Sequence, residues 1–211
     1  MMTKVPTRFA LATFAATLAL STAAIADDGG LYEKPLDPNS AFVRVIAPGA
    51  TTASVQNSAF NQLEEGVSPY VAVAPGDIPV SSSFGEGSVK ASAGKFYSVV
   101  VTKAGATTVV DDITKNPSKA TLSLYNLTEK AAIDLFVPQA GAEAVSDVDS
   151  GGSKSVALRA PLAVDLVVRE GDKDLAKLDK VEFKRLAGVT IVVTGEGDQV
   201  DAVAVPSTIA R

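Results

Sequence analysis

The chain has 211 residues, with 19 lysine and arginine residues against 24 aspartate and glutamate residues, which gives a formal net charge of −5 at pH 7. This acidic balance argues against nucleic acid as a partner, because binding a polyanion needs a positive surface. The sequence contains no histidine and no cysteine. Ser-His-Asp triads, Cys-His dyads, zinc sites built on histidine or thiolate, and disulfides are therefore excluded. We predict no catalytic residue, no metal site and no cofactor.

The N-terminus has the pattern of a cleavable secretory signal peptide. Lys4 and Arg8 form a basic start, Phe9 to Leu20 an apolar stretch, and Ala24-Ile25-Ala26 a small-x-small cleavage site. The alternative is an uncleaved membrane anchor, but this apolar stretch is shorter than the roughly 20 residues that span a bilayer. We predict an exported, non-spanning mature chain from Asp27 with a net charge of −7, because cleavage removes two of the 19 basic residues and none of the 24 acidic ones.

The mature sequence has the spacing of an all-β protein. Short runs rich in Val, Leu, Ile, Thr and Tyr alternate with Gly, Pro, Asn and Asp about every ten residues. Strands are predicted from Ala41 to Ile46, from Pro69 to Val73, up to Val80 after a turn at Pro75-Gly76-Asp77, and from Lys95 to Thr102. Asp111 to Lys119 is polar and lacks apolar periodicity, so we predict a connector there.

Strands resume after the connector. Thr121 to Tyr125 and Ala132 to Val137 each alternate in hydrophobicity, and Asn126-Leu127-Thr128-Glu129 between them is predicted as a hairpin loop. Further strands are predicted from Leu162 to Val168, from Val181 to Lys184 and from Val189 to Thr194. Asp172 to Leu178 fits either a short helix or a loop between strands.

Both halves open with a strand and a short turn, and both close with an aliphatic strand that ends at a Gly turn. We predict an all-β fold of two tandem β-sandwich domains joined by a short linker. A single larger sandwich is the alternative, because such punctuation is common to many β proteins. The predicted parts are a signal peptide at 1–26, an N-terminal sandwich at 27–110, a linker at 111–119 and a C-terminal sandwich at 120–211.

The chain has four tyrosines and no tryptophan, so it offers few aromatic platforms for a sugar ring. Tyr70 and Tyr97 lie among valines and are predicted to pack in a core. Arg44 lies between Val43 and Val45 and is predicted to project from the solvent face of its strand. The predicted binding residues are Tyr32, Arg44, Lys95 and Tyr125.

Several short blocks resemble one known family. Leu31-Tyr32, Pro35, Ser40 to Val45 and Gly94 to Tyr97 occur in the order in which that family carries them. A later set of blocks agrees, made of Asn116, Lys119-Ala120, Asn126-Leu127-Thr128 and Lys130-Ala131. On these blocks, and on its length and signal peptide, the chain resembles the AlgF family of alginate biosynthesis proteins.

The resemblance implies a periplasmic accessory protein of alginate O-acetylation with two β-sandwich domains. Its partners would be periplasmic and membrane-bound alginate O-acetyltransferase proteins, which it would bridge as a non-catalytic adaptor. One alternative is a carbohydrate-binding module that holds an acidic exopolysaccharide such as alginate through Arg44, Lys95 and nearby polar groups. Another is an acetyltransferase that carries the acyl group on Ser or Thr, but the sequence shows no base to activate such a residue.

Overall fold

The structure, a computed structural model, describes residues 36–210. This range contains sixteen β-strands and no helix, and hence no helix that could cross a membrane. The predicted signal peptide and Tyr32 lie outside the described residues. The first eight strands are β1 Ala41–Ile46, β2 Ala53–Val55, β3 Ser58–Phe60, β4 Val71–Val73, β5 Gly76–Ser82, β6 Gly85–Ala91, β7 Phe96–Thr102 and β8 Gly105–Asp111. The second eight are β9 Lys119–Asn126, β10 Ala132–Val137, β11 Ala142–Asp149, β12 Ser153–Arg159, β13 Leu162–Glu170, β14 Lys173–Phe183, β15 Gly188–Glu196 and β16 Gln199–Ser207.

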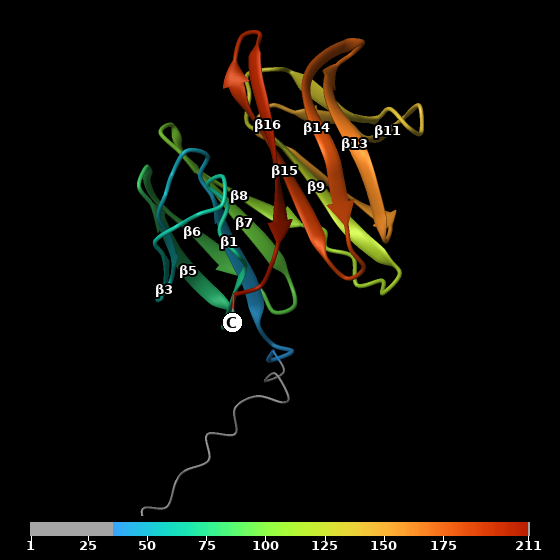
Figure 1. The fold of residues 1–211 in the computed structure, drawn as a ribbon. Coiled ribbons are helices and arrows are strands. Elements are labelled where there is room, and N and C mark those ends of the chain that lie inside the picture. The colour runs from blue at the N-terminus through green and yellow to red at the C-terminus, as the bar shows by residue number, and fades with distance from the viewer. Residues whose placement is uncertain (1–35, 211) are drawn as a thin grey trace, which may run out of the picture. The chain divides into compact units, whose positions relative to one another are not determined.

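The strands form four sheets of four strands each (Figure 1). We name each sheet by its lowest-numbered inner strand. The β1 sheet has the order β4-β1-β7-β8, and the β2 sheet has the order β3-β2-β5-β6. The β9 sheet has the order β12-β9-β15-β16, and the β10 sheet has the order β11-β10-β13-β14.

The two halves of the chain share one topology. Adding eight to each strand number of the β1 and β2 sheets gives the strand orders of the β9 and β10 sheets. Both halves also contain one parallel pair, β1 with β7 and β9 with β15, among otherwise antiparallel neighbours. The predicted fold class, all-β with two tandem sandwiches, is confirmed. The residue boundaries that we gave for separate domains stay a prediction.

Each half encloses its own apolar core, because alternate side chains of two facing sheets point toward each other. In the N-terminal half, Val43 and Val99 of the β1 sheet share a core with Ile78 of the β2 sheet. In the C-terminal half, Leu122 and Leu124 share a core with side chains of the β10 sheet that include Ile133, Leu135 and Leu166.

A third core joins the two halves. Ile46 and Val100 on the outer face of the β1 sheet pack with Tyr125, Val192 and Val205 on the outer face of the β9 sheet. The central strands β7, β9 and β15 are consequently buried on both faces over most of their length. This explains why their sequences are almost continuously apolar or hydroxylated instead of alternating with charges.

The last described residues return to the N-terminal half. The backbone N–H of Tyr70 donates to the carbonyl of Thr208 at 2.8 Å, and the N–H of Ala210 donates to the carbonyl of Tyr70 at 2.7 Å. Residues 208–210 therefore cover the edge of the β1 sheet next to β4.

Two of the predicted local structures are wrong. Asn126 to Glu129 does not close a hairpin, because β9 pairs with β12 and β15 while β10 pairs with β11 and β13. This segment instead carries the chain from one sheet of the sandwich to the other, so that both strands point their apolar residues into one core. Asp172 to Leu178 forms neither a helix nor a loop beyond its first residue, since β14 begins at Lys173.

Candidate functional site

A group of polar side chains is sealed between the β1 sheet and the β9 sheet. We call it the Arg44 cluster, and its members come from both halves of the chain. They are Arg44, Tyr70, Ser98, Asp111, Tyr125, Thr190 and Ser207.

Arg44 enters this space because of strand alternation. Val43 and Val45 point into the N-terminal core, so the side chain between them leaves the opposite face of β1, toward the β9 sheet. Its exposed fraction is 1%. The guanidinium donates to Ser98 Oγ at 2.7 Å and to Thr190 Oγ1 at 2.7 Å.

Two longer contacts complete the surroundings of the guanidinium. It donates to Ser207 Oγ at 3.3 Å and to Tyr125 Oη at 3.4 Å. Its central carbon also lies 4.4 Å from the centre of the Tyr70 ring, a distance at which the ring face attracts a cation. The charge of Arg44 is thus held by hydroxyl groups and an aromatic face, most of them supplied by distant parts of the chain.

Asp111 is the anion of the cluster, at the end of β8. Its carboxylate accepts hydrogen bonds from Ser98 Oγ at 2.6 Å, from Tyr70 Oη at 2.7 Å and from Tyr125 Oη. Ser98 and Tyr125 contact both Arg44 and Asp111, so these two hydroxyl groups bridge the cation and the anion. The arrangement compensates both buried charges, as burial of ionised groups requires.

Burial dominates the electrostatics of the two tyrosines. It raises the pKa of Tyr70 well above its usual value, although the positive charge of Arg44 acts in the opposite direction. Burial raises the pKa of Tyr125 likewise, again against the effect of Arg44. Burial alone would lower the pKa of Arg44, but Tyr70, Tyr125 and Asp111 around it raise it. At neutral pH the cluster therefore contains a charged arginine and two neutral phenols.

The structure corrects two of the four predicted binding residues. Arg44 does not project to solvent and Tyr125 is not on the surface, because the strand face that carries them is covered by the other half of the chain. Lys95 is exposed, in the turn before β7. Tyr32 lies outside the described residues. The structure brings Arg44 and Tyr125 together in one cluster and leaves Lys95 outside it.

Tyr70 and Tyr97 are buried, as predicted, with exposed fractions of 2% and 7%. Two members of the cluster were not among the predicted site residues: Asp111, at the start of the predicted polar connector, and Ser98, within an otherwise aliphatic strand. The available signal was chemical: an arginine between two core valines needs an anion and polar partners if its face is covered.

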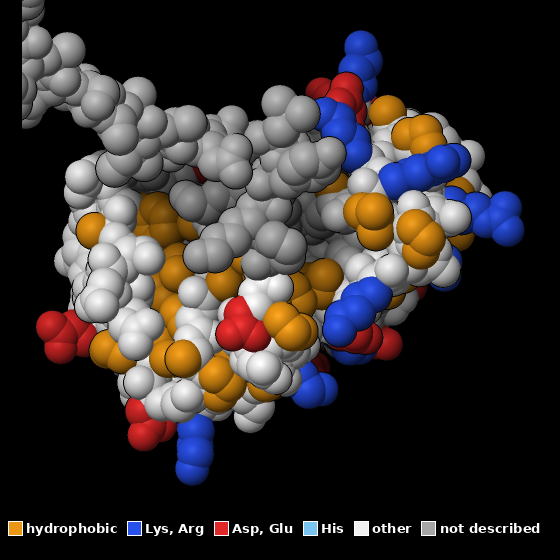
Figure 2. Space-filling model, turned by 90° about the horizontal axis from the view of Figure 1, so that it is seen from below, with side chains coloured by type: hydrophobic (Ala, Val, Ile, Leu, Met, Phe, Trp, Pro, Cys, Tyr) orange, Lys and Arg blue, Asp and Glu red, His pale blue; other side chains and the backbone are white. Residues whose placement is uncertain are grey.

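A groove lies next to the cluster and opens to solvent. Its cavity volume is 880 Å³. Tyr70 belongs to both features, since its ring lines the groove and its hydroxyl reaches Asp111. Phe42 and Phe96 stack in the groove with ring centres 4.4 Å apart, and Tyr70 meets Phe96 edge-on at 5.2 Å. Figure 2 views this end of the molecule and shows many hydrophobic side chains on it, with Lys and Arg side chains gathered on the right.

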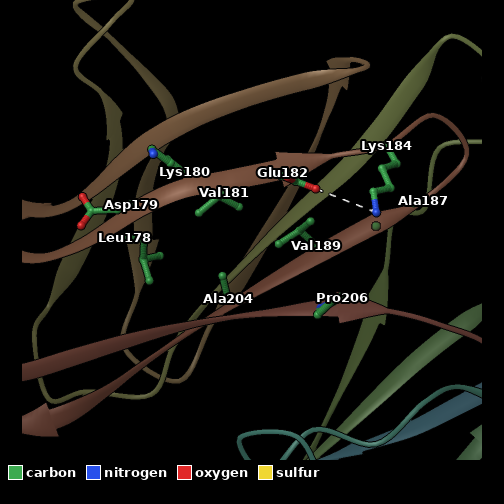
Figure 3. A pocket seen from close by; sticks show the side chains of 11 residues that line it. Leu178, Asp179, Lys180, Val181, Glu182, Lys184, Ala187, Val189, Ala204 and Pro206 are labelled. Carbon is green, nitrogen blue, oxygen red and sulfur yellow. Dashed lines mark ion pairs between the residues drawn. The ribbon is translucent and has the colours of Figure 1, made fainter.

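A second, smaller hollow of 460 Å³ lies in the C-terminal half (Figure 3). It lies at the seam where β14 and β16, the edge strands of the two sheets, approach each other. Leu178, Val181 and Val189 give it an apolar wall, and the ion pair between Lys184 and Glu182, at 3.9 Å, lies on its rim. The hollow is an opening between the sheets of one sandwich and is separate from the Arg44 cluster.

Residues 36–210 contain no group of three or more Asp, Glu, His or Cys side chains arranged to hold a metal ion. Every buried side-chain nitrogen and oxygen in this range also has a hydrogen-bond partner. The candidate features of the described chain are therefore the buried cluster and the open groove, which shares Tyr70 and Ser207 with it.

These observations define an all-β protein made of two sandwiches of one topology, joined by a buried charge cluster. Comparison with protein families then identifies it. The model described as "Alginate O-acetyl transferase AlgF" matches residues 15–190, and the chain belongs to the AlgF family. The resemblance inferred from short sequence blocks is confirmed.

Individual relatives agree with this assignment. The chain is 27% identical over 195 residues to alginate biosynthesis protein AlgF of Pseudomonas syringae pv. tomato, which covers 90% of this chain and 87% of the relative. It is 28% identical over 206 residues to the AlgF protein of Pseudomonas putida, with 94% of each chain covered. The solved C-terminal domain of AlgF from P. aeruginosa matches 42% of this chain and 98% of its own, at 26% identity and a TM-score of 0.38.

Proposed function

We propose that this protein is a non-catalytic periplasmic adaptor that is required for O-acetylation of alginate and bridges the acetyltransferase components. Membership of the AlgF family supports the link to alginate, because the relatives are named alginate biosynthesis proteins. The basic start, apolar stretch and cleavage site of the N-terminus support export.

The observation that carries the non-catalytic part of the proposal is the burial of the Arg44 cluster. Ser98 and Asp111 form a hydroxyl–carboxylate pair at 2.6 Å, which is the kind of contact that could activate a nucleophile. The exposed fraction of Ser98 is 0% and that of Asp111 is 6%, so neither an acetyl donor nor a polymer can reach the hydroxyl. Because the chain also lacks histidine, the usual base that activates a serine is missing.

The alternative, a carbohydrate-binding module, receives less support. Arg44, one of the two contacts named for it, is buried between the two halves, and so is Tyr125, another predicted binding residue; the two side chains contact each other. Lys95 is exposed, but one lysine does not hold a polyuronate against the salt of a physiological medium.

The function can be tested by using the mature chain, Asp27 to Arg211, as bait in periplasmic and membrane extracts of an alginate-producing host. We expect acetyltransferase proteins of the alginate pathway to be captured, and purified polyuronate to show no saturable binding in a parallel titration. Incubation of the purified chain with an activated acetyl donor and polyuronate should give no acetylated polymer. Acetyl transfer by the chain alone, or saturable polymer binding without protein capture, would refute the adaptor function.

A further inference from the structure

Three chain segments meet at one end of the C-terminal half, where the chain enters β9, β13 and β15 (Figure 1). The N–H of Leu186 donates to the carbonyl of Lys119 at 2.9 Å, and the N–H of Ala160 donates to the carbonyl of Ser118 at 3.1 Å. We call this surface the basic end and define it by residues 113–119, 159–162 and 184–187.

The basic end contains five cationic residues and no acidic one. Asp112 and Glu182 border it, and Glu182 forms an ion pair with Lys184 at 3.9 Å. The other four cations have no Asp or Glu of residues 36–210 within ion-pair distance. Figure 2 views the molecule from below, the side on which these segments lie in Figure 1, and shows Lys and Arg side chains gathered on its right. The five cations are Lys115, Lys119, Arg159, Lys184 and Arg185.

The packing of the strands brings like charges together at the basic end. Lys119 of β9 lies directly opposite Arg159 of β12 in the antiparallel pair, a position in which two like charges destabilise a sheet. Arg185 Nε donates to the carbonyl of Ala160, the residue after Arg159, at 2.9 Å, which holds a third cation beside this pair. Folding alone does not favour such a group, so the cations point to a ligand outside the chain.

Two exposed leucines lie among these cations. Of the four large hydrophobic side chains exposed in residues 36–210, Leu162 at 39% and Leu186 at 68% belong to the basic end. The φ angle of Leu186 is 58°, in the left-handed region, which Gly and Asn adopt more easily than Leu. Its side chain is therefore exposed at a position where another residue would suit the backbone better.

The other end of the same strands is acidic. It is formed by residues 127–131, 170–173 and 196–198, which follow β9, join β13 to β14 and join β15 to β16. These segments contain five acidic residues against two basic ones. The C-terminal half thus has opposite charge at its two ends, which turns the basic end toward an extended anionic surface. The acidic residues are Glu129, Glu170, Asp172, Glu196 and Asp198, and the basic ones are Lys130 and Lys173.

We propose that the basic end is a peripheral membrane-contact surface that binds the head groups of anionic phospholipids. Lys119, Arg159 and Arg185 lie against the phosphates, and the exposed leucines enter the boundary between head groups and acyl chains. An anionic bilayer combines an extended negative surface with an apolar layer directly beneath it. A polyuronate offers the negative charge but no apolar layer, so it leaves the two leucines in water.

Co-sedimentation of the mature chain, Asp27 to Arg211, with lipid vesicles tests this contact. We expect binding to phosphatidylcholine vesicles that contain about 30% phosphatidylglycerol, and none to pure phosphatidylcholine. Raising NaCl from about 50 mM to about 500 mM should weaken binding roughly fivefold or more, because salt screens the head-group charge. The chain as a whole is negative, so attraction to anionic lipid reports a local group of cations.

A dye attached to a single cysteine shows which end touches the lipid, since the chain has no cysteine of its own. An environment-sensitive dye at Ser118→Cys, an exposed position of the basic end, should shift its emission to the blue when anionic vesicles are added. The same dye at Gln199→Cys, exposed next to the acidic end, is the control and should not respond.

Two substitutions test the assignment of the contact, each with a matched control. Arg159→Gln should weaken vesicle binding about fivefold, the contribution of one cation near an anionic surface. Lys154→Gln removes an exposed cation from the other end of the same strand and should leave binding unchanged. Leu186→Asn should keep or raise the thermal unfolding temperature and weaken binding roughly fivefold or more, whereas Leu186→Met, which keeps an apolar side chain, should not.

Several results would overturn the membrane contact. It is wrong if the chain does not bind anionic vesicles at low salt, if pure phosphatidylcholine binds equally well, or if Arg159→Gln binds as the unchanged chain does. A response at Gln199→Cys without one at Ser118→Cys would place the lipid at the wrong end. Saturable binding of polyuronate that Arg159→Gln abolishes would show a polymer site instead, and loss of protein capture by Arg159→Gln without vesicle binding would show a protein interface.

The membrane contact does not depend on the adaptor function, because purified chain and lipid test it alone. If anionic vesicles bind and no acetyltransferase protein is captured from extract, the adaptor function is wrong while the membrane contact stands. If acetyltransferase proteins are captured and vesicles do not bind, the membrane contact is wrong while the adaptor function stands.

Discussion

Replacing Arg44 with methionine removes the cation of the buried cluster while it keeps an unbranched side chain of similar length. Asp111 then keeps its three hydroxyl donors in the space between the β1 and β9 sheets but loses the positive charge of the cluster. The hydroxyl oxygens of Thr190 and Ser207 on the opposite side lose the N–H donor from which they accept hydrogen bonds. We expect a strongly destabilised protein whose two halves are less firmly joined.

The magnitude follows from the contacts. The two short bonds of Arg44, to Ser98 and Thr190, are each 2.7 Å long, and a hydrogen bond to a charged group contributes about 1.5–3 kcal/mol. Their sum agrees with the roughly 3–5 kcal/mol that removal of one partner from a buried ion pair costs. With a urea m-value of about 2 kcal/mol/M, the midpoint of unfolding should fall by roughly 1.5–2.5 M.

Urea unfolding of the mature chain, followed by far-ultraviolet circular dichroism, measures this change. The control is a double-mutant cycle with Asp111→Asn, which makes the anion neutral at constant shape. We expect the double variant to lose clearly less stability than the sum of the two single variants, because each single change leaves a buried charge that the other removes. A loss of less than about 1 kcal/mol for Arg44→Met, or additive losses in the cycle, would refute the reasoning.

Three further predictions concern the same architecture. Because burial raises the pKa of Tyr70 and of Tyr125 above the usual 10.0, the folded state holds these protons more tightly than the unfolded chain. The free energy of unfolding should be constant at neutral pH and fall as the pH rises above about 10. Ultraviolet absorbance of tyrosinate should show both ionising only as the protein unfolds, and a titration of all tyrosines in the folded state would contradict this. Removing residues 208–211 deletes the two backbone hydrogen bonds to Tyr70 and should cost roughly 1–3 kcal/mol, with faster amide exchange at Tyr70 but not in β13; unchanged exchange would count against the role of this segment. Gly66→Ala places a Cβ atom 2.3 Å from a backbone carbonyl oxygen at a φ of +76° and should cost roughly 2 kcal/mol or more in thermal unfolding; Gly94→Ala, at a φ of +71° with open space around it, is the control and should cost less.

Much of the fold follows from local patterns. Val43 and Val45 are core residues of β1, and Leu122 and Leu124 are core residues of β9. Both strands lie where the spacing of apolar residues and turn residues predicts them. The polar stretch that follows Asp111 separates β8 from β9, as expected from its lack of periodicity. These features depend on neighbours within one strand or turn, and a sequence displays them directly.

Local sequence patterns do not show which strands pair with one another. β1 pairs with β7 and β9 pairs with β15, across five intervening strands in each half, and no local pattern distinguishes these pairings from hairpins. The same reason explains the wrong hairpin at Asn126 to Glu129. The alternation of apolar and polar residues along a strand shows which of its side chains point into a core. It does not show to which of the two sheets around that core the strand belongs.

By itself, the sequence determined the fold class, the duplicated plan, the family and the absence of histidine chemistry, because each of these depends on residue types or on short-range order. Only the tertiary structure decided whether Arg44 and Tyr125 are buried or exposed, since the alternation along their strands predicted that both side chains face solvent. The face of β1 that carries Arg44 also carries Phe42 and Ile46, and the face of β9 that carries Tyr125 also carries Thr121 and Ser123. Whether such a face meets water or a second sheet depends on packing between residues that lie 81 positions apart. Burial then turned two expected surface contacts into the centre of a charge cluster that joins the halves, and it left the groove beside Tyr70 as the open surface.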